Sequence, residues 1–338
     1  FKQKTAYEML RSLVGSEMCI RDRNWYPASD GMPATIILSL AVTPENQVFS
    51  GTGGQGVFCS TNDGISWFAR NENLSNLYIW SLAYRHGILL AGTMGGGVFR
   101  STNAGANWIP SGLSSSFINA VGISADTVFY AATRGQGLYR STDCGQSWIP
   151  VSLPDTVFWS FAVGNNGALY AGSSRYGIFT STDAGVHWRA DGGSFPRLSV
   201  FTQIDGKFFA GAYKDGLFYS ADNGNNWLPV PLPYRNNDVA AVIRDGSGKI
   251  YIATSPGGIL QNEIWPYQWI PKNNGLPSAS VHTLATSEPC YLPARTGAEF
   301  FVPIIRAMTG GQPAPIAFLS KQFFSSRLPV FLPLRWVT

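Results

Sequence analysis

The stretch Ser60-Thr61-Asn62-Asp63-Gly64-Ile65-Ser66-Trp67 decides the fold of this chain, because it recurs at an almost constant interval. Further copies occupy residues 101–108, 141–148, 181–188 and 220–227, and all follow the pattern S-x-[DN]-x-G-x-x-W, which we call the box. A repeat of about 40 residues indicates one small β unit that is used several times. The fixed box positions are Ser60, Asn62, Gly64, Trp67, Ser101, Asn103, Gly105, Trp108, Ser141, Asp143, Gly145, Trp148, Ser181, Asp183, Gly185, Trp188, Ser220, Asp222, Gly224 and Trp227.

The tryptophans extend this period beyond the clear boxes. Trp25 and Trp269 continue the series at intervals of 39 to 42 residues. Residues 262–269 form a degenerate copy, whereas Asn24-Trp25 looks like the end of a box whose beginning is missing. About six repeats of about 40 residues are therefore expected in this chain.

Each repeat is expected to form four short strands and no helix. In the second repeat the expected strands are residues 80–84, 88–92, 97–101 and 107–110. Short apolar runs bounded by Gly, Asn and Asp are strand and turn signals, and no segment of helical length has a 3.6-residue apolar period. Four strands per repeat predict an all-β protein, a β-propeller of four-stranded blades.

The chemistry of the box explains its place in such a blade. It falls on the hairpin between the third and fourth strands, where an Asp or Asn side chain can accept hydrogen bonds from turn amides. The Gly supplies a positive φ, and the Trp offers a large apolar ring to the seam between sheets. We therefore expect the box to be a structural device.

The pattern resembles the Asp-box, or BNR, repeat family of propellers, over about residues 24–288. Members of that family include sialidases, the sortilin luminal domain, xyloglucan-cleaving glycosidases and a photosystem II assembly factor. The resemblance implies the propeller fold. It implies no single function, because one fold can carry many activities.

The first 23 residues do not fit the repeat. Residues 18–23, Met-Cys-Ile-Arg-Asp-Arg, can be encoded by a transposase mosaic end used in sequencing libraries, and residues 2–17 match the adapter and index gap before it. We predict that residues 1–23 are a non-native, adapter-derived segment. The alternative is a genuine leader with a short amphipathic helix at residues 5–13. It is not a signal peptide, because it lacks a long enough apolar core.

The repeat is lost again after about Ser287. Residues 281–286 begin a new unit, but the residues from Pro289 on do not continue it. A shifted frame of the same codons permits a string with the spacing of residues 92–108, ending in a box. We therefore predict that residues 289–338 are an out-of-frame tail and that residues 24–288 are an incomplete propeller. The parent protein would then have seven or more blades. An authentic Pro-rich extension is the alternative.

Composition gives no argument for nucleic acid, metal or membrane. The formal net charge is +4, but residues 24–288 carry 14 basic and 16 acidic residues, so the propeller is near neutral. Cys59 and Cys144 and the scattered histidines have no metal-type spacing, and we expect no disulfide framework, metal or cofactor. No apolar run is long enough for a membrane span.

The loops between second and third strands predict where a ligand would bind. In a propeller they share one face with the loops between blades; we call this the loop face, and we expect the boxes on the opposite face. Aromatic and cationic side chains there suit glycans or peptides, and Met94 and Phe117 fall on the same face. In the alternative interpretation, many of these aromatics, Trp80 and Trp159 above all, pack between blades. The candidate binding residues are Tyr78, Arg134, Arg175, Tyr176, Arg197, Tyr213, Lys214, Tyr234 and Arg235.

No catalytic residue is predicted. A sialidase needs an arginine triad, a Tyr–Glu pair and an acid Asp, and residues 24–288 hold four glutamates, none in such a pattern. A xyloglucanase-type glycosidase needs two carboxylates across a cleft. Asp155, Asp215 and Asp238 fall on the loop face, but nothing pairs them, and we expect each to be a solvated turn residue.

We therefore expect a non-catalytic, secreted or cell-surface binding module for a glycan or a protein. One alternative is a glycoside hydrolase, sialidase- or xyloglucanase-like, whose catalytic loops are missing from this fragment. Another is an assembly or sorting factor resembling the photosystem II factor or sortilin. Low charge with many Gly, Ser, Asn and Thr residues suits an exported protein.

Overall fold

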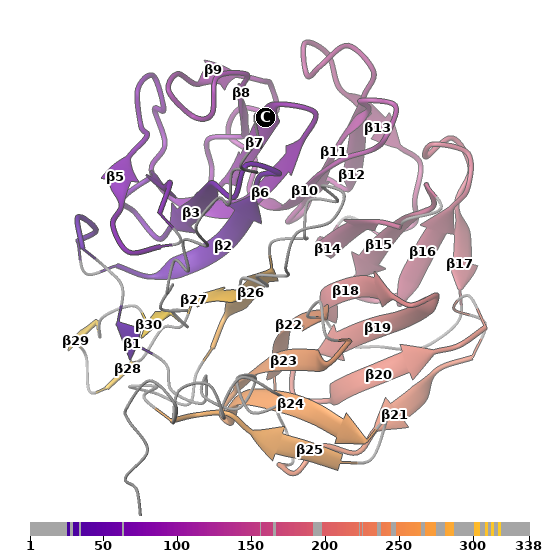
Figure 1. The fold of residues 1–338 in the computed structure, drawn as a ribbon. Helices are drawn as coiled ribbons and strands as arrows, with labels where there is room; N and C mark the ends of the chain where they lie inside the picture. Colours follow the sequence, from indigo (N-terminus) through magenta and orange to yellow (C-terminus); the bar gives the residue numbers. More distant parts are fainter. Residues whose placement is uncertain are drawn as a thin grey trace, which may run out of the picture.

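The protein is a β-propeller in which six four-stranded antiparallel blades follow one another around a ring (Figure 1). This confirms the all-β fold, and the described residues contain no helix. The architecture is taken from a computed structural model. It describes residues 26–27, 30–33, 35–62, 64–155, 157–164, 167–191, 198–222, 224, 226–234, 238–244, 248–264, 268–274, 281–286, 301–304, 308–309, 312–313 and 317–318.

Within every blade the strands pair in chain order, so each blade is a simple meander. The first blade is β2 (Ile37–Val42), β3 (Val48–Thr52), β4 (Val57–Ser60) and β5 (Phe68–Ala69); the second is β6 (Ile79–Arg85), β7 (Ile88–Thr93), β8 (Val98–Ser101) and β9 (Ile109–Pro110); the third is β10 (Ile118–Ile123), β11 (Phe129–Thr133), β12 (Leu138–Ser141) and β13 (Ile149–Val151). The fourth is β14 (Phe158–Val163), β15 (Leu169–Ser173), β16 (Ile178–Ser181) and β17 (Arg189–Asp191); the fifth is β18 (Leu198–Ile204), β19 (Lys207–Ala212), β20 (Gly216–Ser220) and β21 (Leu228–Val230); the sixth is β22 (Asp238–Arg244), β23 (Ile250–Ser255), β24 (Gly258–Ile264) and β25 (Gln268–Pro271).

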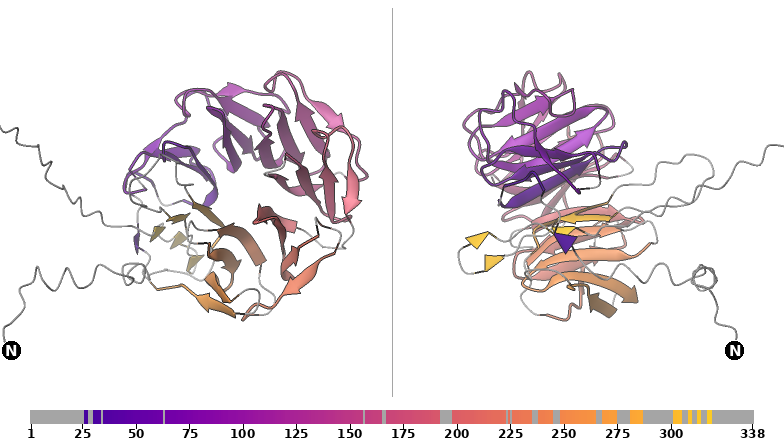
Figure 2. Two further views of the ribbon diagram at one scale, coloured as in Figure 1. Left: turned by 45° about the vertical axis from the view of Figure 1, so that its right-hand side comes forward. Right: turned by 60° about the vertical axis from the view of Figure 1, so that its left-hand side comes forward.

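A seventh, partial sheet stands between the sixth blade and the first. β26 (Thr283–Thr286) contacts both β22 and β2 and pairs with β27 (Phe301–Ile304). β1 (Tyr26–Pro27) pairs with β30 (Ala317–Phe318), which contacts β27. The ring of first strands is thus closed (Figure 2). A further pair joins β28 (Met308–Thr309) to β29 (Gln312–Pro313).

The place of β1 agrees with its sequence. Trp25-Tyr26-Pro27 matches Trp108-Ile109-Pro110, where the last two residues form a fourth strand. β1 therefore matches a fourth strand in sequence, and it pairs with β30 in a separate two-stranded sheet. The origins of residues 1–23 and 289–338 stay predictions, and residues 1–23 lie outside the described residues.

The core lies in the seams between neighbouring blades. Second strands such as β3, β11 and β15 are buried along their whole length, because a blade on each side covers both of their faces. The box Trp residues of the second to fifth blades pack into the seam toward the preceding blade. Trp108, for example, is 1% exposed and shares a cluster with Phe49 of β3 and Leu89 of β7.

The outer strands are short, and several contain a proline. Both features disfavour pairing of the exposed edge with another chain. Pro110, Pro150 and Pro229 stand at the second position of β9, β13 and β21. Proline lacks the amide hydrogen that a further strand would need, so it protects an edge strand from edge-to-edge association.

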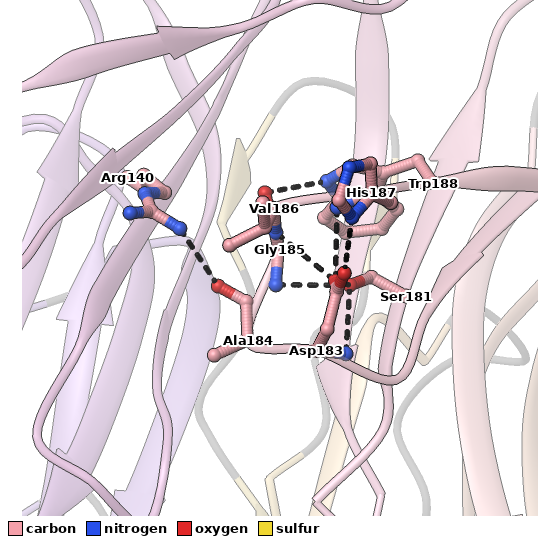
Figure 3. Close-up of polar contacts among 8 residues, drawn as sticks. All are labelled: Arg140, Ser181, Asp183, Ala184, Gly185, Val186, His187 and Trp188. Atoms are coloured by element: carbon pink, nitrogen blue, oxygen red, sulfur yellow. Dashed lines mark hydrogen bonds and ion pairs between the residues drawn. The ribbon is translucent and has the colours of Figure 1, made fainter.

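The box turns share one hydrogen-bond pattern, shown for the fourth blade in Figure 3. Ser181 Oγ accepts the amide of Gly185 at 2.9 Å and donates to Asp183 Oδ1 at 2.9 Å. Asp183 Oδ1 also accepts the amide of His187 at 2.9 Å. In the five boxes the Ser–Gly bond measures 2.8 or 2.9 Å, so the serine hydroxyl satisfies the same buried amide each time.

The turn also ties neighbouring blades together. The carbonyl of Ala184 accepts a hydrogen bond from Arg140 Nη1 of the third blade at 3.3 Å (Figure 3). It also accepts one from Tyr130 Oη of the same blade at 3.0 Å. Trp108 Nε1 donates to the carbonyl of Arg70, in the loop from the first blade, at 2.8 Å. Burial raises the pKa of the Tyr130 hydroxyl, which keeps that donor protonated.

The box has a backbone feature that its sequence pattern does not reveal. The box glycines have φ between 74° and 87°, and Ala104, Cys144 and Ala184 before them also have positive φ. Two successive left-handed residues are therefore needed, and in these boxes only the second is glycine. The first is small enough to be tolerated there, although a side chain in this region costs energy.

Replacing Ser181 with Ala should destabilise the protein by about 1–3 kcal/mol, because the buried amide of Gly185 loses its acceptor. Thr182→Ala, an exposed change in the same turn, should leave stability within about 0.5 kcal/mol. Urea unfolding followed by tryptophan fluorescence measures both. Equal midpoints for the two variants would contradict the role of the serine.

The box aspartates predict a stability change in acid. The backbone amide of Asn226 and then its side-chain amide lower the pKa of Asp222 to about 2; the hydroxyl and amide of Ser147 and the amide and ring of His187 act likewise on Asp143 and Asp183. A carboxylate whose pKa is lowered in the folded state stabilises the fold at pH values above its unfolded pKa of about 3.9. This stabilisation is lost as the pH falls through the folded-state pKa. Asp222→Asn should therefore be less stable at pH 6, with the difference closing between about pH 4 and 2. A constant difference over that range in urea midpoints would contradict this assignment.

Candidate functional site

The loop face is built by backbone contacts between neighbouring blades. The amide of Met94, in the β7–β8 loop, donates to the carbonyl of Tyr78 at 3.0 Å. The amide of Arg134, in the β11–β12 loop, does the same to Phe117 at 2.9 Å, and the amide of Ser174, after β15, to Val157 at 3.0 Å. In the second, third and fourth blades, the loop between the second and third strands is thus joined to a segment between blades. This arrangement places both loop sets on one face.

A threonine or serine fixes the shape of each of these loops. Thr93 Oγ1 donates to the carbonyl of Gly97 at 2.8 Å and accepts the amide of Gly96 at 3.0 Å. Thr52 and Thr133 make the same pair of contacts. The loops therefore have a common backbone conformation, and only the side chains between the Thr and the Gly differ from blade to blade.

The first strand of every blade carries a bulge just after this joint. The pairing with the second strand skips one residue at the same place in all six blades. Bulges redirect side chains and are frequent beside functional sites. The bulged residues are Leu38, Trp80, Asn119, Trp159, Ser199 and Ala240.

The candidate residues of the third and fourth blades lie on exposed loop tips. Arg134, Arg175 and Tyr176 are exposed. The guanidinium carbon of Arg134 lies 5.2 Å from the centre of a Trp159 ring, an attractive cation–π arrangement. The ring of Tyr176 has its edge toward Phe179, at 6.5 Å between centroids.

The other described candidates are divided between the first two blades and the fifth. Tyr78 is half-buried beside the Gly53 turn, where a Cβ on Gly53 would lie 3.4 Å from its hydroxyl. Tyr213 and Lys214 are exposed on the β19–β20 turn, with the ammonium 5.2 Å from the ring centre, and Tyr234 is exposed after β21. Arg197 and Arg235 lie outside the described residues.

Asp155 is not the solvated turn residue that the sequence predicts. It is 6% exposed, and its carboxylate accepts hydrogen bonds from the hydroxyl of Ser173 at 2.5 Å and the amides of Ser174 and Arg175 at 3.0 and 3.2 Å. It also accepts the amide of Val157 at 3.2 Å. Asp155 therefore holds the loop that presents Arg175 and Tyr176. Its partners in the β15–β16 loop are distant in sequence, so the residues around Asp155 alone could not reveal these contacts.

Asp238 likewise serves the backbone. Its Oδ1 accepts the amide of Lys214 at 2.8 Å, so it fixes the β19–β20 turn, while Asp215 is exposed on that turn. The described residues show no pair of carboxylates placed across a cleft. The glycosidase arrangement therefore has no support from the described part of the loop face.

Sequence reasoning gave too little weight to three apolar side chains on this face. Leu77, Met94 and Phe117 are 40%, 36% and 40% exposed. Met94 and Phe117 lie opposite each other in an isolated bridge, and the carbonyl of Leu77 accepts the amide of Gly56 at 2.8 Å. These three residues are in, or next to, the segments whose backbones are hydrogen bonded between blades. Their positions in the repeat could therefore have identified them from the sequence.

Metal, redox and membrane features add nothing to this site in the described part of the chain. Among those residues no cluster of His, Cys, Asp and Glu could hold a metal ion, and no helix could span a membrane. Cys59 and Cys144 are free thiols. Burial raises the pKa of Cys59 to about 11, so it is not a reactive thiolate.

Asp155→Ala should lower the free energy of unfolding by about 2–3 kcal/mol, because it leaves buried donors without an acceptor. Asp215→Ala removes an exposed carboxylate from the β19–β20 loop of the fifth blade and should change stability by less than about 0.5 kcal/mol. Urea unfolding compares the two. Similar stability of the two variants would show that Asp155 does not hold its loop.

Comparisons with known proteins agree with this architecture. No protein-family model matches the chain, and no curated protein matches it in sequence. The extracellular domain of the one-component system BT4673 from B. thetaiotaomicron has a TM-score of 0.67 at 13% identity, over 89% of this chain and 40% of that one. YCF48 bound to D1 peptide has a TM-score of 0.65 at 14% identity, over 90% and 97%.

A glycoside hydrolase structure is also similar. The GH74 xyloglucanase from Xanthomonas campestris has a TM-score of 0.57 at 17% identity, over 73% of this chain and 46% of that one. The chain thus spans less than half the length of the BT4673 domain and the xyloglucanase. At these identities the likenesses show a shared propeller fold.

Proposed function

We propose that this chain is a non-catalytic binding module, outside the cell or at its surface, whose loop face takes a glycan or a protein ligand. The observation that carries the proposal is the set of exposed apolar side chains on that face. Exposed apolar patches on a soluble protein mark interaction sites more often than chance. The set comprises Leu77, Met94, Phe117, Tyr176, Tyr213 and Tyr234.

The remaining exposed apolar side chains of the described residues have a different distribution. Phe68, Ile109, Ile149 and Leu228 each lie on the outer strand of a separate blade. Ile65 and Val186 lie on box turns of the first and fourth blades. Scattered single residues of this kind are ordinary at a protein surface. The loop face differs because backbone hydrogen bonds join its residues from blade to blade.

The similar structures support binding and favour no one ligand. YCF48 carries a bound D1 peptide, and the BT4673 structure is an extracellular domain. An assembly or sorting role and a secreted location are therefore compatible with the proposal. The glycoside hydrolase alternative draws support from the GH74 structures. Because the Asp155 carboxylate is engaged by Ser173 and the β15–β16 loop, the described residues favour binding over hydrolysis.

The test compares two double variants of the full chain. Met94→Ser with Phe117→Ser removes two exposed apolar side chains from the loop face, and Ile65→Ser with Val186→Ser removes two from box turns. A glycan array and a displayed peptide library identify ligands of the wild-type protein. The loop-face variant should bind them at least about tenfold more weakly, corresponding to about 1.4 kcal/mol, and the box variant should bind normally.

Two outcomes would contradict the proposal. One is loss of binding in the box variant with normal binding in the loop-face variant. The other is turnover of xyloglucan or a sialoside by the wild-type chain, measured as release of reducing sugar or sialic acid. The two double variants should unfold at similar urea concentrations, because all four side chains are exposed.

A further inference from the structure

We infer that the ligand of the loop face is an extended polypeptide segment that carries carboxylates beside apolar side chains. This rests on the proposed function and names its ligand class. The surface concerned is formed by Leu77, Met94, Phe117, Arg134 and Arg175 of the second to fourth blades, and we call it the loop-face arc. Three of these side chains are apolar and two are cationic.

The arc is continuous along the backbone. Met94 is hydrogen bonded to Tyr78, the neighbour of Leu77, and bridges to Phe117. Phe117 in turn accepts the amide of Arg134. The apolar side chains therefore lie at one end of the arc and the two arginines at the other. A ligand that follows the arc meets an apolar surface first and positive charge next.

The two arginines have no carboxylate partner among the described residues. Ion pairs there join His187 to Asp183 and Arg244 to Asp205, away from the arc. The β7–β8, β11–β12 and β15–β16 loops contain no acidic residue, and the nearby Asp155 is buried, with its carboxylate hydrogen bonded to Ser173 and to the backbone of the β15–β16 loop. Charge complementarity therefore calls for an acidic ligand, since Arg binds carboxylates through paired hydrogen bonds.

The aromatic rings near the arc favour a peptide over a neutral sugar. Sugars stack on open aromatic faces, but the Arg134 guanidinium lies over Trp159. Tyr78 lies against the Gly53–Gly54 turn, within 4 Å of the Cβ positions. The arc itself exposes Leu77, Met94 and Phe117, and beside it Tyr176 is also exposed. Such side chains match the apolar side chains of a polypeptide, and Met in particular adapts to varied partners.

The charge on the rest of the face is of mixed sign. Asp215 and Asp238 are on the fifth and sixth blades, beside Lys214. An acidic segment laid along the arc therefore approaches the arginines of the third and fourth blades without passing these carboxylates. This favours binding on one side of the ring.

A random twelve-residue peptide library, displayed on mRNA and selected against the 338-residue chain, tests the inference. Enriched peptides should carry net negative charge with Leu, Phe or Met among the acidic residues. Synthetic copies should bind more weakly as salt rises, because exposed charges are screened. In fluorescence anisotropy, Arg134→Gln and Arg175→Gln should each weaken binding about tenfold.

Arg189→Gln is the matched control, since it removes one exposed arginine from the outer strand β17. It should leave binding unchanged. Enrichment of neutral or basic peptides, or equal binding by Arg134→Gln, Arg175→Gln and Arg189→Gln, would overturn the inference. A glycan that needs Met94 and Phe117, with no acidic peptide enriched, would leave the proposed function standing and overturn only the ligand class. Failure of both ligand classes would overturn both.

Discussion

The serine hydroxyl of each box is the contact on which the rest of the propeller depends. It is buried and accepts the amide of the glycine four residues later. It also donates to the Asp or Asn two residues later, whose side chain accepts the backbone amide four residues further along the chain. Together these bonds satisfy polar groups of the turn, whose backbone is left-handed at two successive positions in the boxes of the second to fourth blades. The turn in turn aims the Trp into the seam with the preceding blade.

The box and the loop face divide the work of the repeat. At the box, both backbone and side chains are fixed, because the side chains satisfy turn amides. On the loop face a Thr or Ser fixes the backbone, and the residues between it and the Gly can differ. Met94, Arg134 and Arg175 stand at such variable places. A repeat of this kind can present a different surface from each blade without altering the fold.

The period, the four strands per repeat and the meander order could be predicted because they are local. Strand bounds in the second blade agree to within two residues. The role of Asp155 could not be predicted, because its partners come from the loop after β15, 18 to 20 residues away. The Arg134–Trp159 contact and the bulges at Trp80 and Trp159 depend in the same way on how strands and blades meet. The positive φ of Ala184 was hidden because the residue is not glycine.

Hydrogen–deuterium exchange of the full chain, with and without a ligand recovered from the peptide or glycan screen, tests the division between the two faces most directly. Bound ligand should slow exchange in residues 93–97, 133–137 and 173–177, where amides lie on the loop face. Exchange in the box turns at residues 101–108, 141–148 and 181–188 should stay the same. Protection of the box turns with unchanged exchange in the loops would contradict the account.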